Sequence, residues 1–166
     1  ELLKIIVPSQ RFVTSKVVVN ICFYVEIQSD DDQDGYIDDV NGWDFVLHTN
    51  SPVDPDGHGT HCAGTVGATG NNGLGVTGVC PIVKLMPLRA IVNGTISVST
   101  EVEALEYALV KGAKICSLSF GGPGPISSLE RSAVDDALSA GMLLITAAGN
   151  EASNLDKQPS YPASFP

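Results

Sequence analysis

Apolar runs alternate with amphipathic segments from residue 83 onward, and this alternation predicts most of the secondary structure. The apolar runs at residues 83–88, 113–118 and 142–148 predict strands. The last run is almost wholly apolar, which is typical of a strand covered on both faces. Two amphipathic segments lie between these runs and predict helices.

The first predicted helix begins at a capping box over residues 100–103 and ends at Lys111 and Gly112. The second begins at Ser127, with Glu130 completing a capping box, and ends at Gly141. Each carries an apolar stripe at helical spacing: Val102, Leu105, Ala108 and Leu109 in the first, and Leu129, Ala133, Val134, Ala137 and Leu138 in the second. These stripes predict that both helices pack against a common sheet.

Strand, helix, strand, helix, strand at this spacing predicts an α/β fold, with a parallel sheet and flanking helices. Ligands of such sheets bind beyond the carboxyl ends of the strands, where Ser119 and Asn150 stand. Residues 16–27 are compatible with one more strand. We expect a single domain over residues 1–166. Residues 1–29 are the part of it for which the sequence gives the least indication of secondary structure.

The composition narrows the class of protein. A hydrophobic fraction of 43% and a charged fraction of 17% indicate a globular chain. No apolar run approaches the ~20 residues of a membrane span, and no signal peptide is recognisable. A net charge of −10 disfavours nucleic acid as a partner, because phosphates would repel the chain.

The negative charge is concentrated in one loop. Nine of the 19 acidic residues fall between Asp30 and Asp56, where no Lys or Arg occurs. Residues 30–35 read D-x-D-x-D-G, a pattern in which alternate carboxylates converge on a hard cation and the glycine permits a sharp bend. We therefore expect calcium to bind here, with a solvated acidic surface as the alternative. The expected ligands are Asp30, Asp32, Asp34, the carbonyl of Tyr36, and Asp38. Asn41 replaces the terminal Glu of a full EF-hand loop.

The four cysteines show neither C-x-x-C pairing nor zinc spacing. Cys62 and Cys116 fall in segments predicted to be buried, so we expect free thiols there. A disulfide between Cys22 and Cys80 is an alternative that the sequence neither predicts nor excludes.

Residues 56–65 (DGHGTHCAGT) place His58 between two glycines at the start of a run of small residues. Glycines permit close approach of the backbone, and small residues suit a helix packed tightly against its neighbour. A histidine held at such a junction has the geometry of a general base. One alternative is a loop histidine that faces water. Zinc bound by His58 and His61 is disfavoured, because the Glu of an H-E-x-x-H motif is absent.

Five further blocks accompany the histidine motif, at residues 30–45, 71–79, 83–89, 117–122 and 147–150. In order and spacing they resemble the subtilisin-like serine proteases, from about Asp30 to Pro166. Cys62 resembles the proteinase K and kexin branch. The resemblance implies a three-layer α/β/α fold, here incomplete, and a secreted or secretory-pathway protein.

The resemblance also implies roles for individual residues. His58 would be the general base, and Asn150 would donate to the oxyanion of the tetrahedral intermediate. Ser119, Phe120 and Gly121 would pair with the backbone of a peptide or protein substrate, as expected of a serine-type endopeptidase. Residues 93–97 depart from the family's substrate-facing edge, and Ile96 there would narrow a distal subsite.

Two elements of the family's Ser-His-Asp triad are not identified in these residues. Residues 1–29 contain no aspartate, and Asn20 is rejected as its counterpart because no glycine follows it. No Gly-Thr-Ser motif occurs, and Ser164 lacks a flanking glycine. We therefore expect a polypeptide of these 166 residues to be inactive. The alternative to an endopeptidase domain is a non-catalytic calcium- or peptide-binding module; the presence of both His58 and Asn150 favours the enzyme.

Calcium should stabilise the fold through the acidic loop, because the carboxylates repel one another when no cation is bound. At ~100 times its Kd, an ion that binds only the folded state adds roughly 2.7 kcal/mol to the free energy of unfolding. Thermal melts with calcium and with chelator measure the effect. An unchanged melting temperature, or the same shift after Asp32→Ala and Asp34→Ala together, would leave only a solvated acidic loop.

Overall fold

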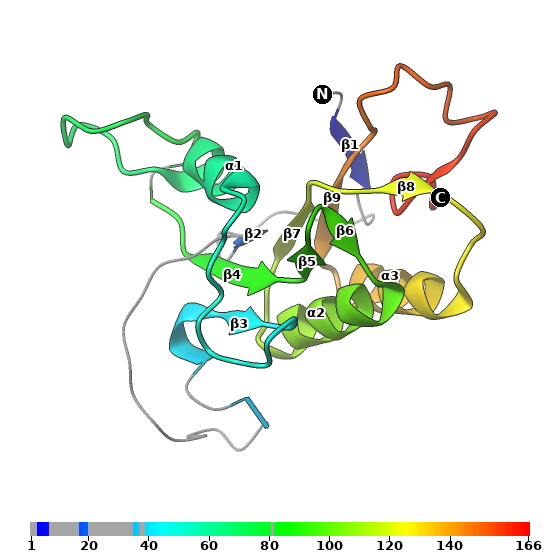
Figure 1. Ribbon diagram of the computed structural model, residues 1–166, viewed down its shortest axis with the longest axis horizontal. Coiled ribbons are helices and arrows are strands. Elements are labelled where there is room, and N and C mark those ends of the chain that lie inside the picture. The colour runs from blue at the N-terminus through cyan, green and yellow to red at the C-terminus, as the bar shows by residue number, and fades with distance from the viewer. Residues whose placement is uncertain (1–2, 7–16, 20–34, 37–38, 81) are drawn as a thin grey trace.

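The computed structural model describes residues 3–6, 17–19, 35–36, 39–80 and 82–166 (Figure 1). Its helices are the 3-10 helix η1 (Asp39–Asn41), α1 (His58–Gly67), α2 (Val98–Val110) and α3 (Ser128–Ser139). Its strands are β1 (Leu3–Ile6), β2 (Val17–Val19), β3 (Trp43–Asp44), β4 (Leu85–Arg89), β5 (Ile91–Val92), β6 (Thr95–Ile96), β7 (Ile115–Leu118), β8 (Gly122–Pro123), β9 (Leu143–Ala147) and β10 (Ser160–Tyr161).

Six of these strands form one sheet in the order β1-β9-β7-β2-β4-β3. Neighbours from β9 to β3 pair in parallel, whereas β1 pairs with β9 in the antiparallel sense. The central strand β2 joins the two halves, since Val17 is in register with Leu85 on one side and with Ile115 on the other. Two antiparallel two-stranded pairs lie outside this sheet: β5 with β6, which are close in sequence, and β8 with β10, which are not.

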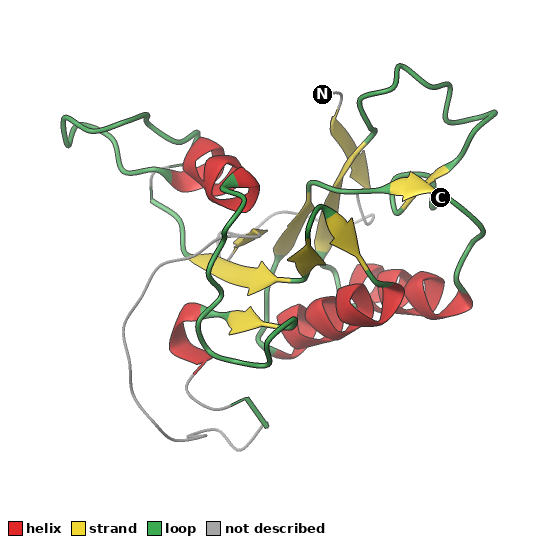
Figure 2. Ribbon diagram, viewed as in Figure 1, coloured by secondary structure: helices red, strands yellow, loops and turns green. Residues whose placement is uncertain are grey.

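The helices lie on both sides of the sheet. Figure 2 shows α2 and α3 side by side along one face and α1 on the other side. This arrangement confirms the predicted α/β class, with a largely parallel sheet and flanking helices. The antiparallel edge strand β1 was not predicted. No helix of the described segments is long and apolar enough to cross a membrane.

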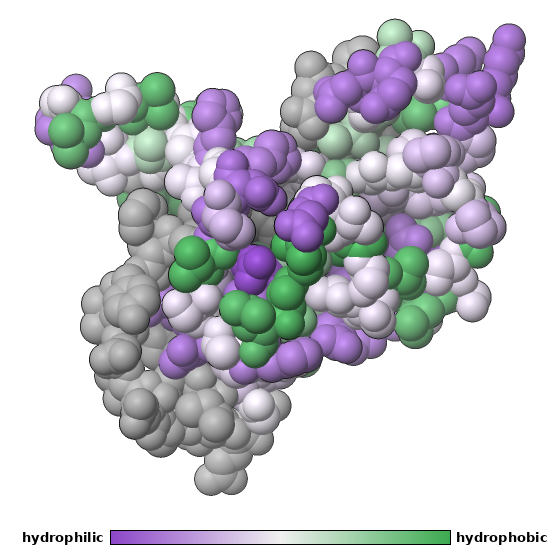
Figure 3. All heavy atoms as spheres, viewed as in Figure 1, coloured by the Kyte–Doolittle hydropathy of each residue, from purple (hydrophilic) through white to green (hydrophobic). Residues whose placement is uncertain are grey.

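The main core lies between the sheet and the pair α2–α3. Its most buried side chains come from α2, α3, β9 and the C-terminal end of the chain: Leu105, Ala108, Val134, Ala137, Leu144 and Phe165. Figure 3 shows hydrophobic residues also gathering on the viewed face over the β3–β5 region, where Leu47 and Val92 are exposed.

The start of α2 differs from the predicted capping box over residues 100–103. The helix begins at Val98, because the Ser97 hydroxyl accepts a hydrogen bond from the Thr100 amide. Ser97 is thus the N-cap, and Thr100 is already inside the first turn. The predicted end is confirmed, since Lys111 caps the helix and Gly112 follows at φ 72°.

The start of α3 agrees with the predicted cap, because the Ser127 hydroxyl accepts a hydrogen bond from the Glu130 amide. The predicted stripe is wrong at one position. Leu129 is 53% exposed, and the buried face runs instead through Glu130, Ala133 and Val134. Glu130 and Leu129 are adjacent in sequence and therefore point in different directions, so the helix buries the acid and exposes the leucine.

The cysteine predictions are confirmed in part. Cys116 is a buried free thiol, whereas Cys62 is only half-buried. Cys80 is exposed and forms no disulfide with another described cysteine. Its candidate partner, Cys22, lies outside the described residues.

A buried ion pair joins β3 to β4. The Asp44 carboxylate is fully buried and accepts hydrogen bonds from Arg89 Nη1 at 2.7 Å and from the amides of Val46 and Leu47. Three donors therefore compensate the loss of hydration that a buried carboxylate suffers. The pair fixes the loop after β3 to the edge of the sheet.

Asp44→Ala should lower the free energy of unfolding by about 3–5 kcal/mol, since it leaves Arg89 largely buried without its counter-ion. Asp135→Ala is the matched control. It breaks an exposed pair with Arg131 within α3 and should cost at most ~1 kcal/mol. Urea unfolding of the two variants measures the difference, and equal losses would contradict this account of Asp44.

Candidate active site

His58 is the first residue of α1, and the residues around it explain why the helix starts there. Gly57 is the N-cap of α1 and adopts φ 75°, a left-handed conformation that favours glycine. Because glycine has no side chain, the N-cap residue itself forms no side-chain hydrogen bond to the helix. Gly59 is buried. The chain therefore turns sharply before His58 and packs closely just after it.

Asp54 supplies the cap that Gly57 lacks. Its carboxylate accepts hydrogen bonds from the Thr60 amide at 2.7 Å, the Thr60 hydroxyl at 2.8 Å and the Gly57 amide at 3.1 Å. Partial burial alone would raise the pKa of Asp54, but these donors together hold the pKa below its usual value. Asp54 thus ties the turn before His58 to the first turn of the helix after it.

The imidazole of His58 is exposed and lies near one thiol. Its Nε2 is 3.9 Å from Sγ of Cys62, one helical turn further along α1. An exposed imidazole at the start of a rigidly capped helix can exchange protons with a molecule bound above the sheet.

Asn150 and residues 119–121 line one cleft of about 410 Å³, to which Glu151 and Ser160 also contribute. Ser119, Phe120 and Gly121 follow β7, and Asn150 follows β9, its neighbour in the parallel sheet. The cleft therefore lies beyond the carboxyl ends of adjacent strands, where the topology predicts a ligand site. His58 is not among the described residues that line this cleft.

Glycines shape the floor and wall of the cleft. Gly149 adopts φ 92°, which turns the chain after β9 and presents Asn150 to solvent. The backbone amide of Asn150 donates to Oε2 of Glu151 at 2.9 Å. At Gly121, a Cβ atom would lie 3.0 Å from the Tyr161 carbonyl oxygen, so glycine permits the close approach of β10 beside the cleft.

Four of the five expected calcium ligands lie outside the described residues: Asp30, Asp32, Asp34 and Asp38. Tyr36 is described, and its ring packs edge-on against Trp43 and Tyr107, with centroid distances of 5.0 and 4.8 Å. The Tyr36 ring is thus packed against the core. Calcium binding stays a prediction.

Two acidic residues have structural roles that the sequence pattern does not predict: Asp54 and Glu101. Asp54 stands four residues before His58 in a proline-rich loop, where nothing in the local pattern distinguishes it from Asp56. Glu101 falls within the predicted capping box over residues 100–103, yet it is only 5% exposed. Its spacing of four and seven residues from Leu105 and Ala108 was the available signal, because those positions share one helix face.

Comparison with known proteins gives the family. The model of the subtilase family matches residues 11–166. Thermitase from Thermoactinomyces vulgaris is 38% identical over 123 residues, covering 74% of this chain and 44% of thermitase. Subtilisin Savinase from Lederbergia lenta is 40% identical over 125 residues, covering 75% of this chain and 45% of that protein.

Solved structures agree on the fold. A lanthipeptide protease superposes with a TM-score of 0.68 at 20% identity, covering 91% of this chain and 45% of that one. MycP1 with its N-terminal propeptide removed gives a TM-score of 0.64 at 24% identity, covering 84% and 44%. The chain spans less than half the length of these relatives. Over the residues that it has, it belongs to the subtilase family.

Proposed function

We propose that this chain supplies the general base and an oxyanion donor of a subtilisin-like serine endopeptidase, which hydrolyses peptide bonds in proteins. The observation that carries the proposal is the shared cleft of Asn150 and residues 119–121 at the carboxyl ends of β9 and β7. The family match and the names of the protease relatives support the same reaction.

His58 is the general base of the proposal. It accepts the proton of the attacking hydroxyl and returns that proton to the leaving amine. Asp54 holds the helix start through Thr60 and Gly57, so the imidazole emerges from a fixed turn. No residue of these 166 is assigned as nucleophile or as orienting acid, and the polypeptide by itself is expected to be inactive.

Asn150 stabilises the developing negative charge. Its backbone amide is engaged with Glu151, so the side-chain NH₂ is the group that donates to an oxyanion in the cleft. A donor held there by the turn at Gly149 need not reorganise as charge develops.

Residues 119–121 bind the substrate backbone. They follow β7 without belonging to any strand pair of the described sheets, and β10 pairs only with the next residues, Gly122 and Pro123. Their backbone is therefore suited to accept an added peptide strand.

Family resemblance adds two further parts to the proposal: calcium bound in the acidic loop, and secretion from the cell.

The test is peptide hydrolysis by the natural protein that contains these residues. His58→Ala should remove nearly all turnover, because the proton of the nucleophile then has no acceptor. Asn150→Ala should lower kcat by roughly 10²–10³-fold, as for oxyanion donors removed from other serine proteases.

His61→Ala is the matched control, since His61 is exposed on the same helix one turn away. It should leave most of the turnover in place. Undiminished hydrolysis in the His58→Ala variant would refute the assignment of the base, and equal losses in both histidine variants would point to damage of α1 instead.

Asp54→Ala should loosen the start of α1, with a loss of about 1 kcal/mol, as for other helix caps. Hydrogen exchange at the Thr60 amide should accelerate, whereas Asp56→Ala, which removes an exposed neighbouring carboxylate, should have little effect. Because the pKa of Asp54 is lowered in the folded state, this protection should be present at neutral pH and lost as the pH falls through that pKa. Equal exchange rates in the two variants would contradict a capping role.

A further inference from the structure

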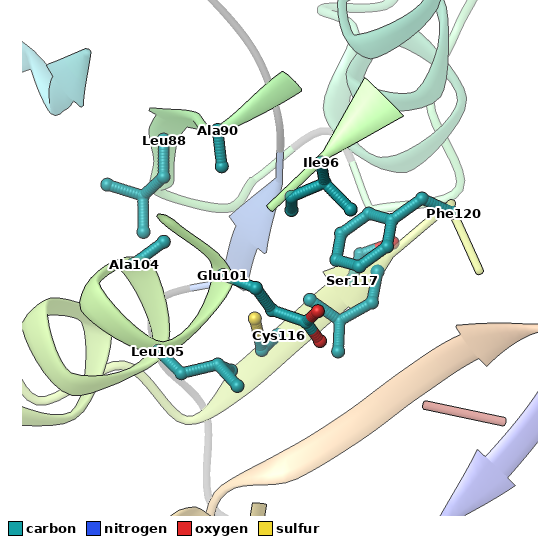
Figure 4. A pocket seen from close by; sticks show the side chains of 10 residues that line it. Leu88, Ala90, Ile96, Glu101, Ala104, Leu105, Cys116, Ser117 and Phe120 are labelled. Atoms are coloured by element: carbon teal, nitrogen blue, oxygen red, sulfur yellow. The ribbon is translucent and has the colours of Figure 1, made fainter. Parts of the chain in front are cut away.

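A second, smaller pocket lies beside the cleft and contains one carboxyl group. Its walls are mostly apolar and come from β4, β6, α2, β7 and the residues just after β4 and β7. Leu88, Ala90, Ile96, Leu118 and Phe120 surround Glu101. Figure 4 shows the Glu101 side chain extending from α2 across Cys116, with its carboxyl group below the ring of Phe120. Glu101 is 5% exposed, so this acid is largely removed from water.

One oxygen of the Glu101 carboxyl group is left without a hydrogen bond by the described residues. This oxygen, Oε1, is buried. A buried polar atom without a partner costs free energy that a bound donor would recover. No Lys or Arg lines this pocket in the part of the chain that the structure describes.

Among the described residues, no cation lowers the pKa of Glu101. Burial, and then the neighbouring Glu130 on α3, raise the pKa of Glu101 to about 8. Cys116 on β7 also contacts this environment, and burial together with Glu101 raises its pKa to about 12. A cation brought next to Glu101 would favour its ionised form and gain a charge-assisted hydrogen bond.

The free volume suits the end of a side chain. It is about 20 Å³, enough for one group the size of a water molecule. Ile96 and Phe120 stand at the pocket with apolar surface that can cover the methylene stem of a long side chain. An ammonium group on such a stem matches the acceptor, the walls and the volume. The larger guanidinium group matches the acceptor and the walls, and needs the pocket to widen.

The pocket is also in the right place to meet a substrate. Phe120 lines both the pocket and the cleft that contains Asn150. A peptide that pairs with residues 119–121 in an extended conformation directs alternate side chains to the same face. One of these side chains would face Phe120 and the pocket behind it.

We propose that this pocket is a subsite selecting a lysine or arginine side chain of the bound peptide, with Oε1 of Glu101 as the acceptor of its cationic group. The inference rests on the proposed function, because it needs a peptide along residues 119–121. An apolar side chain leaves Oε1 unpaired and is disfavoured, although the walls alone would accept it. Glu101 is thereby a specificity-determining residue.

The experiment measures peptide binding to the natural protein carrying His58→Ala, which is expected to bind without cleaving. Fluorescence anisotropy is recorded for peptides in which one position at a time is lysine, arginine, norleucine or glutamate. At one position, lysine or arginine should bind roughly tenfold or more tightly than norleucine, the gain of one charge-assisted hydrogen bond. Glu101→Gln should remove this preference.

Glu103→Gln is the matched control, because Glu103 lies on the same helix but is exposed. It should keep the full preference. The preference in the parent should also grow between pH 6 and pH 9, since the carboxyl group ionises through a pKa of about 8 while the lysine stays charged. In Glu101→Gln the preference should not change with pH.

Three outcomes decide the matter. If peptides bind but norleucine equals lysine and arginine at every position, the subsite is refuted and the proposed function stands. If no peptide binds, the proposed function fails, and the subsite fails with it. If Glu101→Gln does not fold, as judged by circular dichroism, Glu101→Asp replaces it; that shorter acid should weaken lysine binding and leave norleucine binding unchanged, and an unaltered lysine preference would overturn the inference.

Discussion

Parallel pairing of β2 with both β4 and β7 is the constraint on which the rest of the structure depends. Val17–Val19 is the only described segment that joins the half of the sheet carrying β3 and β4 to the half carrying β7 and β9. Parallel strands bring their carboxyl ends to one edge, and the segments after β7 and β9 meet there as walls of one cleft. The position of the candidate site is therefore a consequence of strand order.

Three acids in this fold show how surroundings decide what a carboxyl group does. Asp44 is fully buried yet has Arg89 and two amides as donors, and it stabilises the sheet edge. Asp54 is partly exposed, and its donors lower its pKa and order the turn before His58. Glu101 is buried with an oxygen that has no partner among the described residues, and its pKa is raised. Of the three, only Glu101 has the unpaired buried oxygen and the raised pKa that are typical of a carboxyl group at a binding site.

The sequence alone predicted the elements whose signals are local and strong. The two long helices, the strands around them and the cap at Ser127 follow from apolar periodicity and capping residues. The family could also be recognised, because six motifs occur in one order. The cleft residues came from that recognition, and their roles stay predictions.

What the sequence could not show depends on contacts between distant residues. The central place of β2 could not be read from Val17–Val19, since three valines carry no information about their neighbours in a sheet. The sequence likewise does not indicate that β1 pairs with β9 in the antiparallel sense at the edge of the sheet. Glu101 and Glu130 resemble ordinary first-turn acids, and only the packing of α2 against α3 shows that both are buried. Ser97, and not Thr100, caps α2. The local pattern could not predict this, because both residues are possible caps and lie only three positions apart.

The central claim is that the segments after β7 and β9 form one peptide-binding cleft. The most direct test is NMR titration of the isotope-labelled chain with an extended peptide, following backbone and side-chain amide signals. The account predicts that residues 119–121 and the side-chain amide of Asn150 shift together and saturate at the same peptide concentration. Shifts confined to other surfaces, or separate saturation of the two segments, would contradict it.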